Sequence, residues 1–353
     1  MNLKNLIFAG ARHTHLLSAT AASEWRRQRL LILCYHGVSA HDEHQWNPLL
    51  YITPELLKQR VAFLRRGGYS ILPLNEALER LRAGTLPSCS VAITFDDGSR
   101  DFAEQALPIL TEYEVPVTVY LTTYYCEHRY PVFNTALSYI LWRGRASGID
   151  LQDELGTTAP VPLGDEKERK RAVELVQSIA RARHLDGRGK NQLLAFVARR
   201  LKIDFEGFTR SGLFQLMTPG QVRNLPHHLV DVQLHTHRHR TPRERAAFER
   251  ELDDNHRSIC AITGIQTPRL HFCYPSGDYD ASFLPWLQEW GVVSGVTCVP
   301  GLAGRHSHPL LLPRLIDTMS MSQHGFEAWV SGLAALVPRR AEHRLNRHRI
   351  APS

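Results

Sequence analysis

The chain has 353 residues, of which 43% are hydrophobic and 22% charged, values typical of a folded protein that buries a large core. This composition excludes an intrinsically disordered, collagen-like or disulfide-stapled protein, and no apolar run approaches the roughly 20 residues of a membrane-spanning helix. The net charge of +7 comes from the two ends, since residues 1–29 and 337–353 each carry five basic residues and one acidic residue. A nucleic-acid enzyme concentrates such charge around its binding groove, so we expect no nucleic-acid partner.

Residues 1–29 are predicted to form a basic, amphipathic N-terminal segment, and residues 323–353 a C-terminal helix with a basic tail. We expect both ends to be solvated, with weak membrane-surface association as the alternative. Arg12 and His13 interrupt the first apolar stretch, so we expect no signal peptide. The expected location is cytoplasmic or peripheral at the cytoplasmic membrane, with an extracytoplasmic one left open. No protein partner is indicated, and the six cysteines form no CxxC pair, which predicts reduced thiols.

Strands and helices are predicted to alternate in the first third of the chain. Continuous apolar runs predict buried strands, and helical spacing of apolar residues predicts the helices between them. The expected strands are 30–35, 90–95 and 115–122, and the expected helices 53–67, 74–83 and 101–113. This order is typical of a parallel α/β sheet or barrel, in which chemistry lies at the carboxyl ends of the strands.

Residues 126–212 break this alternation, because they are rich in charge and helix formers and lack strand-like runs. We expect a helical insertion there, either a lid over one end of the site or a surface addition. The alternation then resumes, with strands expected at 229–234, 271–274 and 291–297, and helices at 218–224, 244–263 and 283–290.

Two adjacent carboxylates, Asp96 and Asp97, follow the strand 90–95 and precede Gly98. Side chains alternate along a regular strand, but a glycine turn can bring both carboxylates to one site. One can then bind a metal while the other moves a proton. The alternative is a helix-capping aspartate beside a solvated one.

A histidine cluster, His235-Thr236-His237-Arg238-His239, follows the strand 229–234. Histidines four apart can share a cation on a helical turn, and histidines two apart can do so on a strand, so the pairing stays open. A solvated surface cluster is the alternative. Two imidazoles and one carboxylate would leave coordination positions open, as in catalytic sites. This donor set favours one divalent metal, zinc first, with cobalt, nickel, manganese or iron as alternatives.

The motifs together resemble those of the NodB-homology polysaccharide deacetylases, carbohydrate esterase family four. Thr94-Phe95-Asp96-Asp97-Gly98 is similar to the first motif, and His235-Thr236-x-x-His239 to the second. Residues 35–38 (YHGV) and 272–277 (FCYPSG) are similar to the branch with a Y-H-x-[VI] opening and an F-x-Y-P-x-G third motif. The resemblance implies a deformed (β/α) barrel over residues 30–322, interrupted by the insertion.

The resemblance also implies roles for individual residues. Asp96 would be the catalytic base, and the metal ligands would be Asp97, His235 and His239 rather than His237. Phe272, Tyr274 and Pro275 would form the substrate pocket; the alternative for the two aromatic residues is the core of a strand, and for Phe272 the core is favoured.

This chain departs from the family pattern in three places. Cys273 occupies the position of an arginine that orients the base in many members, no D-x-x-D-W motif is present, and no clear L-x-H motif stands near the end of the chain. Arg314 is a candidate for the orienting residue, and His36 or His308 for the catalytic acid. The alternatives are a surface arginine and structural histidines.

The resemblance implies a metal-dependent hydrolase that removes N-acetyl groups from an N-acetylated saccharide or polysaccharide and releases acetate. Three alternatives stay open: an acetyl-ester hydrolase on the same scaffold, a catalytically weak carbohydrate-binding relative, and an interaction protein that uses its basic ends.

Overall fold

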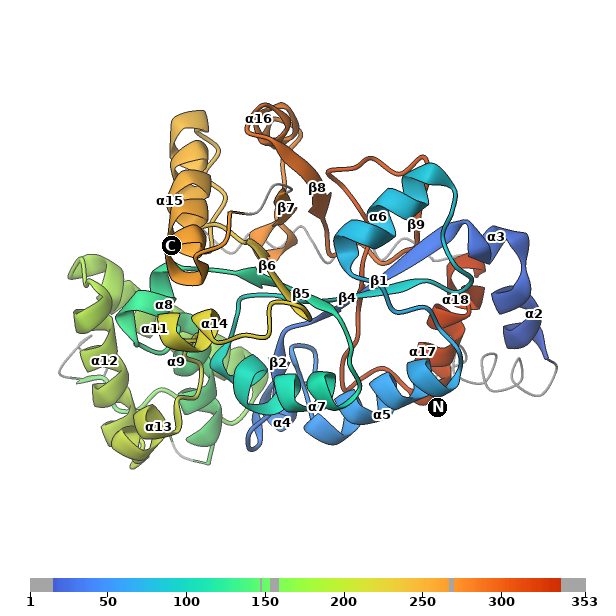
Figure 1. Cartoon of the computed structure of the whole chain (residues 1–353). Helices are drawn as coiled ribbons and strands as arrows, with labels where there is room; N and C mark the ends of the chain where they lie inside the picture. Colours follow the sequence, from blue (N-terminus) through green and yellow to red (C-terminus); the bar gives the residue numbers. More distant parts are fainter. Residues whose placement is uncertain (1–14, 147, 153–158, 267–269, 338–353) are drawn as a thin grey trace.

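A curved, mainly parallel sheet organises the chain, of which the computed structural model describes residues 15–146, 148–152, 159–266 and 270–337 (Figure 1). The strands follow the order β10-β1-β4-β5-β6-β7-β8, and each neighbouring pair is parallel. Short β9 pairs antiparallel with β1, while β2 and β3 form a separate pair. The predicted parallel α/β sheet is confirmed. The strands are β1 (Arg29–Tyr35), β2 (Gly37–Val38), β3 (Tyr51–Ile52), β4 (Val91–Phe95), β5 (Val117–Leu121), β6 (Val230–Leu234), β7 (Leu270–Cys273), β8 (Val292–Val296), β9 (Ala303–Gly304) and β10 (Leu315–Ile316).

Residues 312–316, which include β10, lie between β8 and β1. Leu312 forms a parallel bridge with Val296 at the end of β8, and β10 pairs with β1 through Leu315 and Ile316. One short segment therefore contacts both β8 and β1. This closing segment turns the sheet into a deformed barrel.

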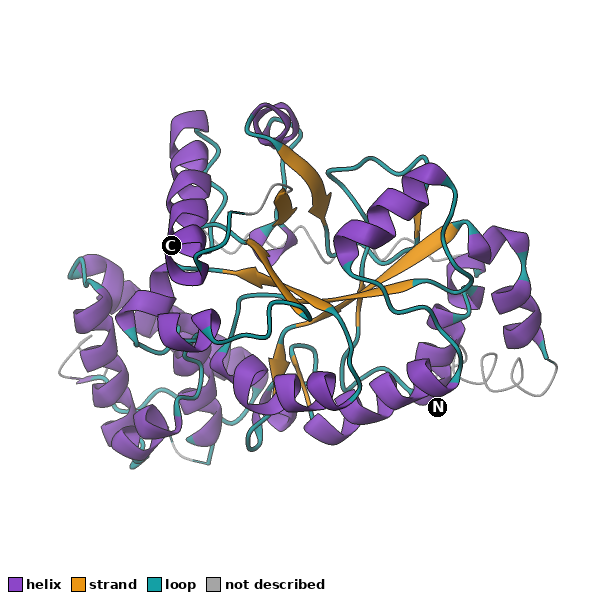
Figure 2. Ribbon diagram, in the orientation of Figure 1, coloured by secondary structure: helices purple, strands orange, loops and turns teal. Residues whose placement is uncertain are grey.

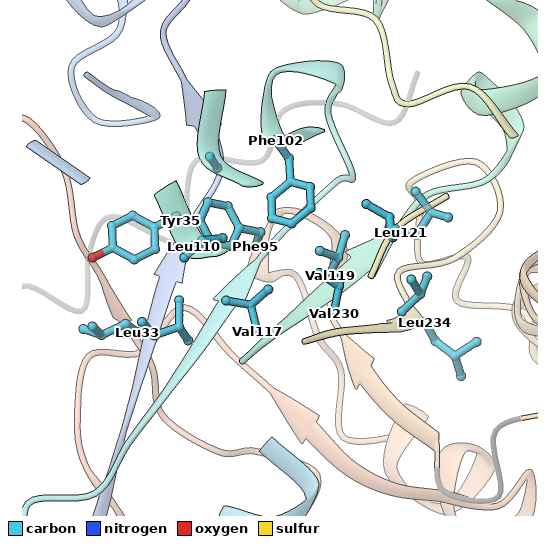
Figure 3. Packing of buried hydrophobic residues seen from close by; sticks show 14 of the residues in the cluster. Leu33, Tyr35, Phe95, Phe102, Leu110, Val117, Val119, Leu121, Val230 and Leu234 are labelled. Carbon is cyan, nitrogen blue, oxygen red and sulfur yellow. The ribbon is translucent and has the colours of Figure 1, made fainter. Parts of the chain in front are cut away.

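Alternate residues of the strands supply two separate apolar layers. Leu33 and Tyr35 of β1 lie in the main core, whereas Leu30 and Ile32 belong to a second cluster on the opposite face. Figure 3 shows the strand residue Phe95 beside the helical residue Phe102, with Leu33 of β1 in the same cluster. Burial on both faces explains why the sequence of these strands is a continuous apolar run.

Helices connect the strands and bury one side against them. Most pack on the main core, and α6 packs on the second cluster. Thr53 caps α5 by accepting a hydrogen bond from the Leu56 N–H, with Pro54 in the first turn, and Thr218 forms a capping box at α14. The predicted helix 101–113 differs in detail, since it begins as a π-helix, η1 (Phe102–Ala106). The helices are α4 (Glu43–Trp46), α5 (Pro54–Arg66), α6 (Leu74–Ala83), α7 (Leu107–Glu112), α14 (Pro219–Arg223), α15 (Arg245–Thr263) and α16 (Phe283–Glu289).

The segment between β5 and α14 is mainly helical in its described residues, as Figure 2 shows. Its helices are α8 (Tyr124–His128), α9 (Phe133–Arg143), α11 (Glu166–Ala182), α12 (Gly187–Arg200) and α13 (Phe205–Ser211). Residues from α9, α11 and α12, among them Ile140, Val176 and Val197, form a hydrophobic core distinct from that of the barrel. Tyr51 of β3 joins this core. The insertion therefore has its own packing and a contact with the barrel rim.

The described part of the N-terminal segment packs on the barrel, contrary to the expectation of a solvated basic end. Here α2 (Leu16–Ala22) and α3 (Glu24–Arg27) lie near α17 (Gln323–Val330) and α18 (Leu333–Leu336). Arg26 is fully buried, and its guanidinium donates to the carbonyl oxygens of Val330, Arg29 and Ser90. These three acceptors explain how an arginine counted toward the charge of the chain end is buried. Most of the other basic residues of the two chain ends belong to residues 1–14 and 338–353. These two stretches lie outside the described residues.

All six cysteines are free thiols, as expected. Among the described helices, none combines the length and the apolar character needed to cross a bilayer.

Candidate active site

Asp96 and Asp97 leave the end of β4 in two different environments. Asp97 and Gly98 both have left-handed backbones, with φ of 69° and 76°, so the chain bends sharply after the strand. A Cβ at Gly98 would lie 2.2 Å from Leu121 Cδ1, which explains the glycine. The Asp96 side chain is only 3% exposed, whereas that of Asp97 is 35% exposed.

Asp97 faces two histidines of the predicted cluster. Its Oδ1 lies 3.1 Å from His235 Nε2 and 3.1 Å from His239 Nε2. The His235 Nδ1–H donates to the carbonyl oxygen of Cys273 at 2.8 Å, so in the neutral ring Nε2 carries a lone pair toward Asp97. Two acceptors that face each other need a proton or a metal ion between them. The donor set therefore fits a divalent metal ion.

The loop after β6 adopts unusual backbone conformations to present these histidines. Thr236 and His239 have φ of 60° and 54°, a left-handed region that costs non-glycine residues free energy and that is frequent at functional sites. The buried Asn255 side chain accepts from the His235 N–H at 3.0 Å and donates to the Leu121 carbonyl oxygen at 2.9 Å. Asn255 thus ties the histidine loop to the end of β5.

His237 points away from this group. Its Nδ1 lies 2.8 Å from Thr123 Oγ1, and its ring packs edge-on against Tyr124. Regular alternation would place the three histidines on one side, but the left-handed backbone of Thr236 breaks it and turns the His237 side chain away. This placement favours the pair spaced by four residues.

The neighbouring histidines determine the pKa of Asp97. Burial raises its pKa, but the opposing effects of His239 and His235 are larger and hold the pKa well below its usual range. The carboxylate is therefore ionised and available as a ligand at neutral pH.

Asp96 is held by Arg314 from the closing segment. The two guanidinium Nη atoms donate to Asp96 Oδ1 and Oδ2, each at 2.7 Å, and Arg314 is fully buried. Arg314 also donates to the Thr297 carbonyl oxygen at 3.0 Å and to Thr94 Oγ1 at 3.1 Å. Burial raises the pKa of Asp96, but the Arg314 charge and hydrogen bonds hold it well below its usual range.

Two thiols complete the surroundings of Asp96. Cys273 Sγ lies 3.3 Å and Cys34 Sγ 3.5 Å from Asp96 Oδ2, and both side chains are buried. Cys273 was identified only as a departure from the family arginine, and Cys34 only as part of a strand. Their position could have been predicted from strand alternation once the strands were aligned.

The two candidate acids lie in different places. His36 Nε2 is 3.7 Å from Asp96 Oδ2, and burial lowers the pKa of its ring despite the nearby carboxylates. His308 is exposed, and its Nδ1 accepts a hydrogen bond from the Leu310 N–H. Only His36 is brought next to Asp96.

Phe272 and Tyr274 point to the main core, on the face of β7 opposite Cys273. The Tyr274 hydroxyl donates to the Leu310 carbonyl oxygen at 2.9 Å. Pro275 begins a short 3₁₀ turn and is buried. Alternation along the strand accounts for this arrangement, and a pocket role for the three residues stays a prediction.

Comparison with known proteins gives one family and one curated relative. The family model described as polysaccharide deacetylase matches residues 83–154 and 193–295. A poly-beta-1,6-N-acetyl-D-glucosamine N-deacetylase of Staphylococcus epidermidis is 31% identical over 133 residues, which cover 33% of this chain and 46% of that protein. The match thus spans about half of the length of the curated relative.

Solved structures share the fold at low sequence identity. The Streptococcus pyogenes deacetylase PplD in complex with acetate is 19% identical, with a TM-score of 0.55 over 88% of this chain and 99% of that one. IcaB from Ammonifex degensii is 17% identical, with a TM-score of 0.54 over 86% of this chain and 97% of that one. These likenesses confirm the predicted deformed barrel.

Proposed function

We propose that this chain, which belongs to the polysaccharide deacetylase family, is a metal-dependent hydrolase that removes N-acetyl groups from an N-acetylated saccharide and releases acetate. The observation that carries the proposal is the different environment of two adjacent carboxylates. Asp97 faces two imidazoles, and Asp96 faces a buried guanidinium. The curated relative, a poly-beta-1,6-N-acetyl-D-glucosamine N-deacetylase, supports a polymer of N-acetylated hexosamine as the substrate class.

Asp97, His235 and His239 are the residues proposed to hold the metal. One carboxylate oxygen and two imidazole nitrogens suit zinc, and also cobalt, nickel, manganese or iron. When bound there, a divalent ion supplies Lewis-acid polarisation and makes water more acidic. The hydrogen bond from His235 Nδ1–H to Cys273 keeps Nε2 free for coordination, and Asn255 fixes the position of the loop.

Asp96 is proposed as the general base. Its pKa is held below the usual range, so the carboxylate is ionised at neutral pH and can accept a proton from the attacking water. Arg314 is proposed as a positioning residue, because its bidentate contact fixes both carboxylate oxygens. It offers a replacement, from a distant part of the chain, for the arginine that the third motif lacks.

His36 is proposed as the acid that protonates the leaving amine, because it lies beside Asp96. Since burial lowers the pKa of its ring, the proton that it gives to the amine would be the one that Asp96 has taken from the attacking water. The bidentate pair of Arg314 and Asp96 weakens the case for a catalytically inactive sugar-binding relative, which rested on the missing arginine. An acetyl-ester hydrolase on the same scaffold would use the same groups, so only the substrate separates it from the proposal.

The test is acetate release from a panel of N-acetylated oligosaccharides and simple acetyl esters, before and after chelation and after metal add-back. The proposal expects amide hydrolysis that chelation abolishes and metal restores. Ester hydrolysis without amide hydrolysis would select the esterase. Tight sugar binding without acetate release from either substrate would select the binding protein.

A further inference from the structure

A second group of potential metal ligands lies beside the proposed base. Cys34 belongs to β1, His36 directly follows that strand, and Asp96 directly follows β4. The two strands are parallel neighbours that pair up to their last residues, Tyr35 and Phe95. The sheet therefore brings a thiol, an imidazole and a carboxylate to one point at its carboxyl edge.

The three side chains have nearly the spacing of ligands around one ion. Asp96 Oδ2 lies 3.5 Å from Cys34 Sγ and 3.7 Å from His36 Nε2, and Cys34 Sγ lies 4.0 Å from His36 Nδ1. Zinc–ligand bonds of about 2.0–2.3 Å place tetrahedral ligands about 3.4–3.6 Å apart. Because Cys34 and Asp96 approach different ring nitrogens, the His36 ring must turn for one nitrogen to bind the ion.

This group shares no residue with the proposed metal site described above. A competing combination is Asp96, His235 and Cys273. His235 is already committed, since its Nε2 faces Asp97 and its Nδ1–H donates to the Cys273 carbonyl oxygen. The group that contains Cys34 therefore stays available when the first site is filled.

Charge and access at this point fit a thiophilic cation. A thiolate and a carboxylate balance the two charges of a divalent ion, and the thiol proton is released to solvent when the metal–sulfur bond forms. Arg314 donates to Asp96 Oδ2, which leaves a second lone pair on that oxygen. Its positive charge weakens the site, so we expect it to fill after the first one. The His36 side chain is 18% exposed and gives an ion an entry.

We propose that Cys34, His36 and Asp96 form a second, inhibitory site for zinc. Mixed sulfur, nitrogen and oxygen donors suit this metal. An ion there would coordinate the carboxylate proposed as the base and the imidazole proposed as the acid, so that neither could transfer a proton. The inhibition rests on the proposed function, whereas the binding of the second ion does not.

Cobalt tests the site in place of zinc, because a thiolate bound to Co²⁺ gives a sulfur-to-metal charge-transfer band in the near ultraviolet. The proposed first site contains no sulfur, so this band reports on the second ion alone. The full chain, freed of metal and kept reduced, is titrated with Co²⁺ while absorbance and acetate release are followed. We expect activity to rise with the first equivalent. As the second ion binds, the band should appear and acetate release should fall at least about 100-fold, the lower end of what a general base contributes.

Matched thiol variants locate the second ion. Cys34→Ser should abolish both the band and the inhibition, the latter measured against the activity of that variant at one equivalent. Cys273→Ser removes another thiol beside the base, 3.3 Å from Asp96 Oδ2, and should keep the band. Cys260→Ser removes a thiol that lies 3.4 Å from His256 Nε2 and should also keep it. Cys34→Ala replaces Cys34→Ser if the serine variant does not fold by circular dichroism.

Asp97→Asn weakens the first site, so in this variant the band should appear with the first equivalent of cobalt. No band in the wild type at saturating cobalt, or a band retained without Cys34, would overturn the second site. A band without loss of acetate release would overturn its inhibitory role. A chain that shows the band but releases no acetate at any cobalt concentration would refute the proposed function and support the second ion.

Discussion

Replacing Arg314 by methionine should damage stability and catalysis together, because it leaves the Asp96 carboxylate buried without a counter-charge. The wild-type pair is fully buried, and both Nη atoms donate at 2.7 Å. Removing one partner of such a pair typically costs about 3–5 kcal/mol. We expect a loss of this size in the free energy of unfolding at pH 7, measured by urea denaturation.

The pH dependence of this loss follows from the direction of the pKa change. In the wild type, Arg314 lowers the pKa of Asp96, so its stabilising contribution is present above the ordinary carboxyl pKa. That contribution is lost only as the pH falls through the lowered pKa. In the variant, burial is left as the main effect and raises the pKa of Asp96 above its ordinary value. The destabilisation should therefore be smaller near pH 4.5 than at pH 7, and the acidic limb of kcat/KM should move to higher pH.

A double-mutant cycle with Asp96→Asn separates this charge effect from simple loss of packing. The double variant carries no buried charge, so it should be more stable than the sum of the single changes predicts, by about 1–3 kcal/mol. Additive losses, or a destabilisation by Arg314→Met that does not change with pH, would refute the reasoning.

Asp96→Asn alone should lower turnover by about 10²–10⁴-fold while bound metal is retained; a loss below threefold would assign Asp96 a structural role. Asp97→Ala, His235→Ala and His239→Ala should each reduce metal content and activity together, whereas His237→Ala, the matched control, should spare both. Metal content measured by elemental analysis checks this, and a metal-free His237→Ala beside a metal-loaded His239→Ala would show that the ligand set is wrong. Ile140→Ala, in the fully buried core of the insertion, should cost about 2–5 kcal/mol in urea unfolding and leave metal content unchanged; a parallel loss of metal would show that insertion and barrel form one unit.

Local patterns predicted most of the fold and the residues that lie around the proposed metal site. Strands such as β1 and β4 are buried on both faces, so their apolar runs are visible in the sequence. Adjacent aspartates and histidines at strand ends were predicted to lie together because parallel strands end at one edge of the sheet.

Contacts between distant residues were harder to predict. Arg314 is 218 residues from Asp96 along the chain, and no local pattern distinguishes it from a surface arginine. Arg26 was interpreted as part of a solvated basic end, but its guanidinium is buried and donates to the carbonyl oxygens of Val330 and Ser90, which are distant in the chain. In both cases tertiary hydrogen bonds decide the position of the charge, and these bonds are absent from any sequence window.

Arg314 lies in the closing segment, and this makes assembly of the proposed base dependent on the last strand of the barrel. Asp97, His235 and His239 precede the closing segment in the chain, so these three residues can meet before residues 312–316 insert between β8 and β1. A protein cleaved just before the closing segment would keep its full set of proposed metal ligands while Asp96 lost its guanidinium. Proteolysis at that point would therefore produce a form that still binds metal but turns over no substrate, and metal content would not report the active fraction.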